Sequence, residues 1–391
     1  MAGSGNHDIP AVVFGGYKTA LGVVRSLGRA GVPQYLVSET PDFAGRSRWA
    51  RRFPEGLPVV PSPSDIDDLL AALPLDEAVL IPCSDHWTRA LTTFAPPPGK
   101  RFRTSLPSGE VNDLLADKKT LSALLDRLDI AQPRTVPVAS QDDLDAAMSG
   151  ETRDWFLKPC DSQAFRQHFG CKAYRVESRE EAGRILARVA EAGLEVLLQE
   201  YVPGGADRHY FVDGFVDRHG AIRALFARRR KRMFPVDFGD SSYMASVPLD
   251  ETAEAVAGIR TLFADTPYRG IFSVEFKRDP RDGRFRLIEV NTRPWAMNEF
   301  ATNSGVDVIL MSYRDALGED VPETASYQVG RRSAVLFEDV SAGFKLIRRG
   351  ELGLGEWLGD QFRSEWTLFS WDDPLPDLAR HAGSIAEKFR G

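Results

Sequence analysis

The segment RLIEVNTRPW, residues 286–295, places two oxygen-bearing side chains, Glu289 and Asn291, in an apolar run and follows them with Arg293. Upstream, the strand-like segment GIFSVEFKR carries Glu275. Because side chains alternate faces along a strand, Glu289 and Asn291 are expected on the same side of a sheet. Carboxylate and amide oxygens are hard donors of the type that binds Mg²⁺ together with the phosphates of a substrate. These residues therefore predict a magnesium and phosphate site.

The turn between the two segments determines which of these side chains face each other. If residues 281–283 form a three-residue loop with its glycine in the left-handed conformation, Glu275 pairs with Glu289 and Ser273 pairs with Asn291. Two carboxylates directly across a ladder repel each other, so this register requires a compensating cation.

A simpler interpretation is that these polar residues cover a solvated sheet face, on which Lys277 neutralises one glutamate. In a regular strand, however, Phe285 and Leu287 share the face of Glu289. Two large apolar side chains beside the carboxylate indicate that this face is partly buried, which favours a binding site.

The N-terminal residues 1–110 are expected to form a small parallel sheet, because strand patterns alternate with helical ones. The strand-like segments lie at 9–14, 33–39 and 78–85. Ligands bind at the carboxyl ends of parallel strands, so the Gly15-Gly16 turn and Ser84-Asp85 are candidate substrate contacts. The segment GGYKTALG lacks the G-x-G-x-x-G fingerprint, which argues against a nicotinamide site even though Glu39 follows at a suitable distance.

The central residues 111–200 predict a linking helix followed by a small lobe. Residues 111–129 have a continuous helical pattern, which the two prolines of IAQPRTVPV end. WFLKPC, KAYRV and EVLLQEYVPGG follow as strands, with a helix that starts at a Ser178 to Glu181 capping box. The segment CDSQAFRQHFGC is expected to be a polar loop. Its single glycine, Gly170, leaves open whether this loop covers phosphates.

The remaining residues predict a larger lobe over 201–330, built on two hairpins that turn at Asp217–Gly220 and at PRDG, and a mixed region over 331–391.

Composition excludes several classes of function. With 391 residues, 43% of them hydrophobic, the chain can bury two or three cores, which argues against disorder. Its 49 basic and 56 acidic residues are interspersed, so nucleic acid and membranes are not expected partners.

The three cysteines form no close pair, and the short apolar run after the polar N-terminus is unlike a secretion signal. We therefore expect a cytoplasmic protein that acts on small molecules. The sequence leaves the choice between a monomer and a homodimer open.

Two lysines could complete the phosphate site, Lys118 in ADKKTL and Lys158 in FLKP, although Lys118 alone also reads as a solvated helix residue. The order ADKKTL, FLKP, LQEYVPGG and an acidic hairpin closing in FSVEF and LIEVNTRPW resembles the ATP-grasp superfamily. It is most similar to the carboxylate-amine ligases of the D-aspartate ligase type. The resemblance covers about residues 9–320 and reaches more weakly to WDDPLPD in the tail.

The resemblance implies the fold class, α/β and α+β, with an N-terminal parallel-sheet domain, a small central lobe and a larger antiparallel-sheet lobe that holds the metal. It also implies ATP and Mg²⁺ as cofactors and a role for each matching residue. Lys118, Lys158 and Lys172 would contact the nucleotide, Gln199, Glu200, Tyr201 and Val202 would form the hinge that faces adenine, and Asp207 would bind the ribose. Glu275, Glu289 and Asn291 would hold Mg²⁺, and Arg293 would face the acyl phosphate or the substrate carboxylate.

The basic run ARRRKRMFP, residues 227–235, resembles the family's segment of alternating basic residues. In an extended strand Arg228, Arg230 and Arg232 share one face, and Arg229 lies on the other. We expect Arg230 and Arg232 at the terminal phosphate, because the planar guanidinium binds phosphate through two donors. Nucleic-acid binding is the competing interpretation, but no aromatic stacking platform accompanies the run.

The implied reaction joins a small-molecule carboxylate to an amine with release of ADP and phosphate. Cations neutralise the transferring phosphoryl group, an acyl phosphate forms, and the amine displaces phosphate. No covalent nucleophile is required, and neither Cys160 nor Cys171 has an assignable base. Two alternatives stay open: an ATP-grasp enzyme with another acceptor, through carboxylation or phosphorylation, and a nucleotide-binding regulator without turnover.

Overall fold

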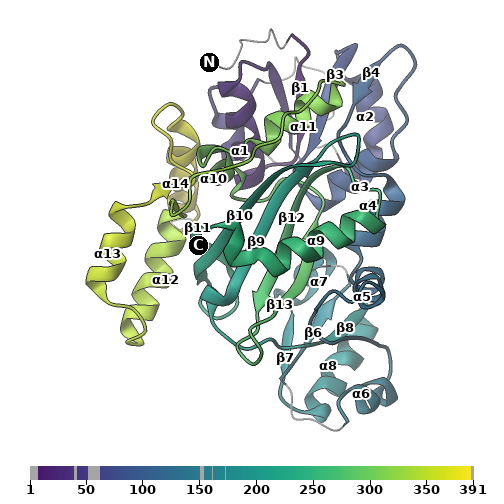
Figure 1. The fold of residues 1–391 in the computed structure, drawn as a ribbon, viewed down its shortest axis with the longest axis vertical. Helices are drawn as coiled ribbons and strands as arrows, with labels where there is room; N and C mark the ends of the chain where they lie inside the picture. Colours follow the sequence, from purple (N-terminus) through teal and green to yellow (C-terminus); the bar gives the residue numbers. More distant parts are fainter. Residues whose placement is uncertain are drawn as a thin grey trace.

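The structure, a computed structural model, describes residues 8–38, 42–51, 62–149, 154–160, 162–171 and 173–388, which form three sheets (Figure 1). The N-terminal sheet is parallel, as expected, with the strand order β2-β1-β3-β4. Its strands are β1 (Ala11–Phe14), β2 (Gln34–Val37), β3 (Glu77–Pro82) and β4 (Arg101–Arg103). Its helices are α1 (Tyr17–Arg29), α2 (Ile66–Ala72) and α3 (Asp85–Thr93), with short 3₁₀ turns η1 (Phe43–Arg46) and η2 (Pro63–Asp65). Glu39 lies outside the described residues.

Two helices, α4 (Gly109–Ala116) and α5 (Lys118–Arg127), replace the single helix predicted over 111–129. Asp117 causes the break. Its carboxylate accepts hydrogen bonds from the backbone N–H groups of Lys119 at 2.8 Å and Thr120 at 3.0 Å, and aspartate in this position starts a new helix. As a result, Lys118 is the first residue of α5.

The small central sheet is antiparallel, in the order β5-β8-β6-β7, and lies at the opposite end of the molecule from the N-terminal sheet in Figure 1. Its strands are β5 (Thr135–Val138), β6 (Trp155–Pro159), β7 (Tyr174–Val176) and β8 (Val196–Glu200). Its helices are α6 (Gln141–Ala147), α7 (Ser162–Phe169) and α8 (Arg179–Glu191). Helix α8 begins directly after its predicted N-cap, Ser178, whose hydroxyl accepts from the N–H of Glu181 at 3.1 Å. The Glu181 carboxylate accepts from the N–H of Glu177 at 2.9 Å and not from that of Ser178, so half of the predicted capping box is present.

Helix α7 contradicts the polar loop predicted for CDSQAFRQHFGC. Phe165 and Phe169 lie one turn apart, with ring centroids 4.7 Å from each other, and both pack against Tyr174 of β7. Phe165 is fully buried. Apolar residues at this spacing share one helix face, and their burial against the sheet stabilises the helix.

The large sheet has seven strands in the order β13-β12-β9-β10-β11-β14-β15, antiparallel except for the last pair. Its strands are β9 (His209–Val216), β10 (Ile222–Phe234), β11 (Asp240–Ser246), β12 (Gly270–Arg278), β13 (Phe285–Asn291), β14 (Arg332–Ala334) and β15 (Glu365–Trp366). Both predicted hairpins are present, as β9–β10 and β12–β13. The boundaries at 110, 200 and 330 stay predictions, and β14 and β15 extend the large sheet beyond the last of them.

The remaining helices are α9 (Ala253–Asp265), α10 (Asn298–Asn303), α11 (Val308–Ala316), α12 (Leu336–Arg348), α13 (Leu354–Phe362) and α14 (Leu375–Lys388), with 3₁₀ turns η3 (Ala206–Arg208) and η4 (Leu249–Thr252). In the described part of the chain, no helix combines the length and the apolar character that a membrane span requires.

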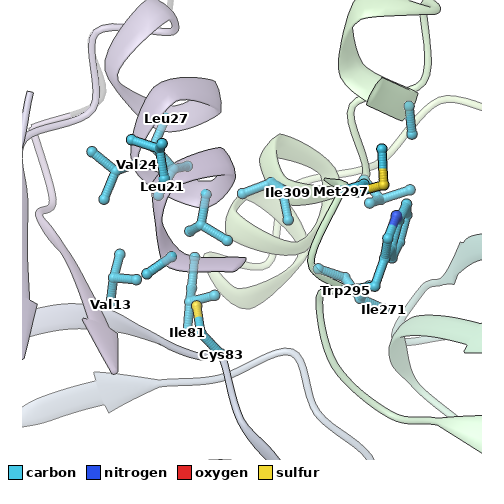
Figure 2. Packing of buried hydrophobic residues seen from close by; sticks show 14 of the residues in the cluster. Val13, Leu21, Val24, Leu27, Ile81, Cys83, Ile271, Trp295, Met297 and Ile309 are labelled. Atoms are coloured by element: carbon cyan, nitrogen blue, oxygen red, sulfur yellow. The ribbon is translucent and has the colours of Figure 1, made fainter. Parts of the chain in front are cut away.

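A shared hydrophobic core joins the N-terminal sheet to the large sheet (Figure 2). Val24 of α1 and Ile81 of β3 belong to the same buried cluster as Ile271 of β12 and Trp295, which follows β13. Burying an aliphatic side chain of this size is worth roughly 1.5–3 kcal/mol. This packing holds the carboxyl end of β3 close to the end of β13, where Arg293 lies.

Candidate functional site

A pocket of about 390 Å³ is lined by residues from all three sheets or the segments beside them. Eleven of the fourteen residues predicted for the site line it: Lys118, Lys158, Gln199, Glu200, Tyr201, Val202, Arg230, Glu275, Glu289, Asn291 and Arg293. Two others, Arg232 and Asp207, line a different cavity, and Lys172 lies outside the described residues.

The two acidic strands meet in the predicted register. Ser273 pairs with Asn291, and Glu275 pairs with Glu289. The Asn291 side-chain N–H donates to Oε1 of Glu289 at 3.1 Å, and its Oδ1 accepts from Nη2 of Arg293 at 3.3 Å. Two carboxylates and an amide oxygen thus come together at one end of the hairpin.

The hairpin turn differs from the prediction. Asp279 and Arg284 close a four-residue loop, in which Gly283 has a φ of 77°. The register therefore shifts by one residue between Glu275 and Phe276, which leaves Ile288 as an extra residue on β13.

Because of this β-bulge, the residues on each face of β13 differ from the prediction. Phe285 and Leu287 pack in the hydrophobic core under the sheet, whereas Ile288 and Glu289 both line the pocket. The prediction that Phe285 and Leu287 share the face of Glu289 was wrong. The burial of this site comes instead from the lobes that surround the pocket.

Glu275 is held as a carboxylate by its neighbours. Its Oε1 lies 2.6 Å from Nδ1 of His209 and accepts a hydrogen bond from Nη2 of Arg230 at 3.3 Å. Burial opposes ionisation, but Arg230, His209 and Lys158 together lower the pKa of Glu275 to about 2. Burial also lowers the pKa of His209, so its ring is neutral at pH 7 and Nδ1–H donates to the carboxylate.

Two lysines carry positive charge that burial disfavours. Burial lowers the pKa of Lys158, although Glu289 and Glu275 oppose this shift. Burial and the nearby Arg230 lower the pKa of Lys277 to about 8, and its ammonium lies 4.6 Å from the ring centre of Tyr201. An incoming anion would stabilise both cations, so this part of the pocket favours phosphate.

The part of the pocket beside the hinge is aromatic. Phe156 and Phe238 stack with ring centroids 5.1 Å apart, and Phe156 meets Tyr201 edge-on at 5.5 Å. The carboxylate of Glu200 is paired with Arg281 at 2.6 Å, and the backbone N–H of Glu200 donates to the carbonyl oxygen of Arg134 at 2.8 Å. Apolar rings beside hinge backbone groups suit a planar heterocycle.

A second β-bulge changes which arginines of β10 share a face of the strand. The β10–β11 ladder shifts between Arg230 and Arg232, so Lys231 is the extra residue and Arg232 faces away from Arg230. Arg232 donates to both oxygens of the buried Asp339 at 2.9 Å each and to Asp360 at 2.7 Å. The expectation that Arg230 and Arg232 meet one phosphate was therefore wrong.

Arg228 and Asp207 are also held by partners outside the pocket. Arg228 forms a buried ion pair with Asp213. The carboxylate of Asp207 accepts from Nη2 of Arg229 at 3.0 Å, and its backbone oxygen accepts from Nε of the same residue at 2.7 Å. A ribose contact by Asp207 stays a prediction, as does the role of Lys172.

Thirteen lining residues were not among the predicted site residues, and three of these have titratable side chains next to predicted ones. Asp85, predicted as a candidate substrate contact at the end of the third strand, pairs with Arg293 through two contacts, at 2.6 and 3.0 Å. Lys277 follows Glu275 at the two-residue spacing of one strand face, which was an available signal. His209 had no signal in the sequence, because its contact with Glu275 depends on the pairing of β9 with β12.

No cluster of three or more His, Cys, Asp or Glu side chains that could hold a metal occurs among the described residues. The donors at the hairpin are instead Glu275, Glu289 and the amide oxygen of Asn291. Mg²⁺ that arrives with substrate phosphates is often bound by only one or two carboxylates and keeps several waters. The oxygen-only set therefore fits Mg²⁺ bound jointly with a ligand's phosphates.

No family model matches the chain. In sequence it is similar to the D-aspartate ligase of Enterococcus faecium (strain Aus0004), with 24% identity over 238 residues. The match covers 59% of this chain and 56% of the relative, so the chain spans about half the length of the curated relative.

Solved structures resemble the fold over most of the chain. N5-carboxyaminoimidazole synthetase from Staphylococcus aureus, complexed with ADP, has a TM-score of 0.61 at 13% identity and covers 83% of this chain and 81% of its own. The biotin carboxylase domain of Hydrogenobacter thermophilus 2-oxoglutarate carboxylase, in complex with MgADP and bicarbonate, has a TM-score of 0.64 at 16% identity, with coverages of 83% and 74%.

The L-amino acid ligase from Bacillus licheniformis has a TM-score of 0.56 at 13% identity, with coverages of 80% and 75%. At such low identities the likeness concerns the fold. The chain therefore shares the fold of these three enzymes.

Proposed function

We propose that this protein is an ATP-dependent carboxylate-amine ligase, which forms an amide bond through an acyl phosphate and releases ADP and phosphate. The observation that carries the proposal is the pairing of Glu275 with Glu289 in a pocket that also holds Lys158 and Arg230. Opposed carboxylates are unfavourable unless a cation binds between them, and the nearby lysine and arginine suit the phosphates that such a cation accompanies.

ATP is the proposed co-substrate and Mg²⁺ the proposed metal, as in the relatives whose structures contain ADP or MgADP. The backbone of Gln199–Val202 and the ring of Phe156 would hold adenine. Glu275, Glu289 and Asn291 would hold Mg²⁺, which when bound neutralises negative charge on phosphate oxygens.

Cationic side chains of the protein would neutralise the rest of the negative charge on the phosphates. Lys158 and Lys277 would face phosphate oxygens, and Arg230 would bridge Glu275 to the transferring phosphoryl group. Arg293 lies two residues beyond Asn291 and already contacts its amide oxygen, so it would orient the carboxylate that is activated. Enclosure by the lobes would exclude water from the acyl phosphate.

The substrates proposed on this basis are a small-molecule carboxylate and an amine. Similarity to D-aspartate ligase and to L-amino acid ligase supports an amine acceptor. Similarity to the synthetase and to the carboxylase domain gives carboxylation as the second candidate.

Hydroxylamine trapping separates these functions. The purified protein is incubated with MgATP, hydroxylamine and a panel of carboxylic acids, and ADP and hydroxamate are measured. Acid-dependent ADP with an equal amount of hydroxamate is the expected result, because hydroxylamine captures an acyl phosphate. ADP release that depends on bicarbonate alone would indicate carboxylation, and a stable phosphorylated product would indicate a kinase. No ADP with any acid would refute the proposal and favour a regulator.

A further inference from the structure

The ion pair between Asp85 and Arg293 joins the N-terminal sheet to the end of the metal-binding hairpin. Arg293 donates to both carboxylate oxygens of Asp85, at 2.6 and 3.0 Å. The Arg293 side chain is 17% exposed, whereas that of Asp85 is 66% exposed. Asp85 begins α3 directly after β3, and the hydroxyl of Ser84 fixes this turn by accepting from the N–H of Trp87 at 3.3 Å.

Asp85 differs from the other carboxylates of the pocket. Glu275 and Glu289 form the proposed metal site, Glu200 is paired with Arg281, and Asp237 is paired with Arg349 outside the pocket. Asp85 is the carboxylate that the N-terminal unit contributes, and its partner is the residue that would orient the activated substrate.

A bidentate contact with a carboxylate is the geometry in which arginine binds a substrate acid. In the structure Asp85 makes that contact with Arg293. A substrate carboxylate that binds Arg293 would bring a second anion next to Asp85. Two carboxylates at one guanidinium repel each other, so the arrangement favours an additional cation between them.

We propose that Asp85 binds the ammonium group of the amine substrate. When the acid substrate binds, Arg293 exchanges its contact with Asp85 for a contact with the acyl group. This inference rests on the proposed ligase function and assigns the acceptor subsite to the N-terminal unit. The acceptor is then an amine that is cationic at neutral pH, and an alcohol or a neutral amide is a poor substitute. The nitrogen then lies beside the acyl carbon, which it attacks as the neutral amine once the ammonium has given up a proton.

The protons of the reaction balance at this site. The ammonium nitrogen gives up two protons when it becomes an amide N–H, as the bond to the acyl carbon forms and the bond from carbon to the phosphate oxygen breaks. One proton goes to the departing phosphate. The other goes to the Asp85 carboxylate and then to water, which the exposed side chain reaches.

The test compares two nucleophiles in the full-length Asp85→Asn variant. Hydroxylamine is uncharged at neutral pH and does not need an anionic partner, so acid-dependent hydroxamate formation should fall at least about 10-fold less than amide formation does. The KM for the amine substrate should rise about 10- to 100-fold, the usual effect of losing a hydrogen bond to a charged group. Asp85→Glu should restore most of the amine affinity.

Asp113→Asn is the matched control. Asp113 is an exposed carboxylate of α4 that pairs with Arg89 of α3 at 3.3 Å, and it lies outside the pocket. This variant should behave like the unmodified protein with both nucleophiles. Thermal unfolding of each variant checks that the fold is retained.

Equal losses of hydroxamate and amide in Asp85→Asn would overturn the inference, because Asp85 would then only position Arg293. Unchanged kinetics with both nucleophiles would also overturn it. If the unmodified protein forms neither ADP nor hydroxamate with any acid, the proposed ligase function fails, and the assignment of Asp85 fails with it.

Discussion

Arg232→Met should destabilise the protein without removing a group from the pocket. The Arg232 side chain is 5% exposed, and its bidentate partner Asp339 is fully buried. Removing one partner of a buried ion pair costs about 3–5 kcal/mol, because the other charge is left without compensation. Ser242, Trp357 and Gln361 still donate to Asp339, so we expect a loss near the lower end, about 3 kcal/mol.

Urea unfolding followed by circular dichroism measures this loss, and MgATP-dependent turnover measures function in the folded state. For Arg232→Met we expect a lower urea midpoint and nearly normal turnover. Arg230→Met is the matched control, because Arg230 lies on the same strand but lines the pocket. Its turnover should fall strongly, with a smaller change in the midpoint.

The double variant Arg232→Met/Asp339→Leu tests the cause of the destabilisation. Because both charges are removed, it should be more stable than Arg232→Met alone. The reasoning would be refuted if Arg232→Met unfolded like the unmodified protein while losing turnover. In that case Arg232 would act at the phosphates, as the unbroken strand pattern predicted.

Three further outcomes are expected. Glu289→Gln should lower kcat for ADP release at least about 100-fold. Its unfolding curve should be unchanged, because the Glu289 side chain is exposed. An active variant would exclude Glu289 from the metal site. Lys158→Met should raise the KM for MgATP, measured by initial rates, and equal KM values would remove Lys158 from the nucleotide site. The pKa of Glu275 is about 2 in the folded protein against an ordinary 4.5, so its contribution to the free energy of unfolding is present above pH 4.5 and lost as the pH falls toward 2. This contribution is at most about 3 kcal/mol, and urea midpoints measured across that range should fall less steeply for Glu275→Gln than for the unmodified protein.

Strand periodicity predicted the site correctly wherever the ladders are regular. The predicted pairs of Glu275 with Glu289 and of Ser273 with Asn291 are present, because the longer loop and the bulge of the hairpin offset each other. Strand periodicity failed at two bulges: the extra residue on β13 changes the facing of Phe285 and Leu287 relative to Glu289, and the extra residue on β10 changes that of Arg232 relative to Arg230. Neither extra residue, Ile288 or Lys231, is a glycine or a proline, so the sequence carries no local sign of the irregularity.

Helix prediction failed for a different physical reason. Residues 111–129 keep an unbroken apolar period, but Asp117 satisfies backbone N–H groups with its side chain and so ends one helix and starts another. Helix α7 was missed because its segment is mostly polar, and its stability comes from two phenylalanines that pack on the small sheet. In both cases tertiary or side-chain contacts outweighed the average character of the segment.

The arginines of β10 show why residue type and strand position do not suffice to assign a site. Arg228 and Arg232 each form an ion pair with a fully buried aspartate, Asp213 or Asp339. If such a guanidinium turned to a phosphate, it would leave a buried carboxylate without its cation. The free energy that this costs opposes phosphate binding by Arg228 and Arg232. Arg230 instead shares Glu275 with His209 inside the pocket, so Glu275 keeps a hydrogen bond if Arg230 turns to a ligand. The deciding aspartates lie 15 and 107 residues away from their partners, beyond the range of any local pattern.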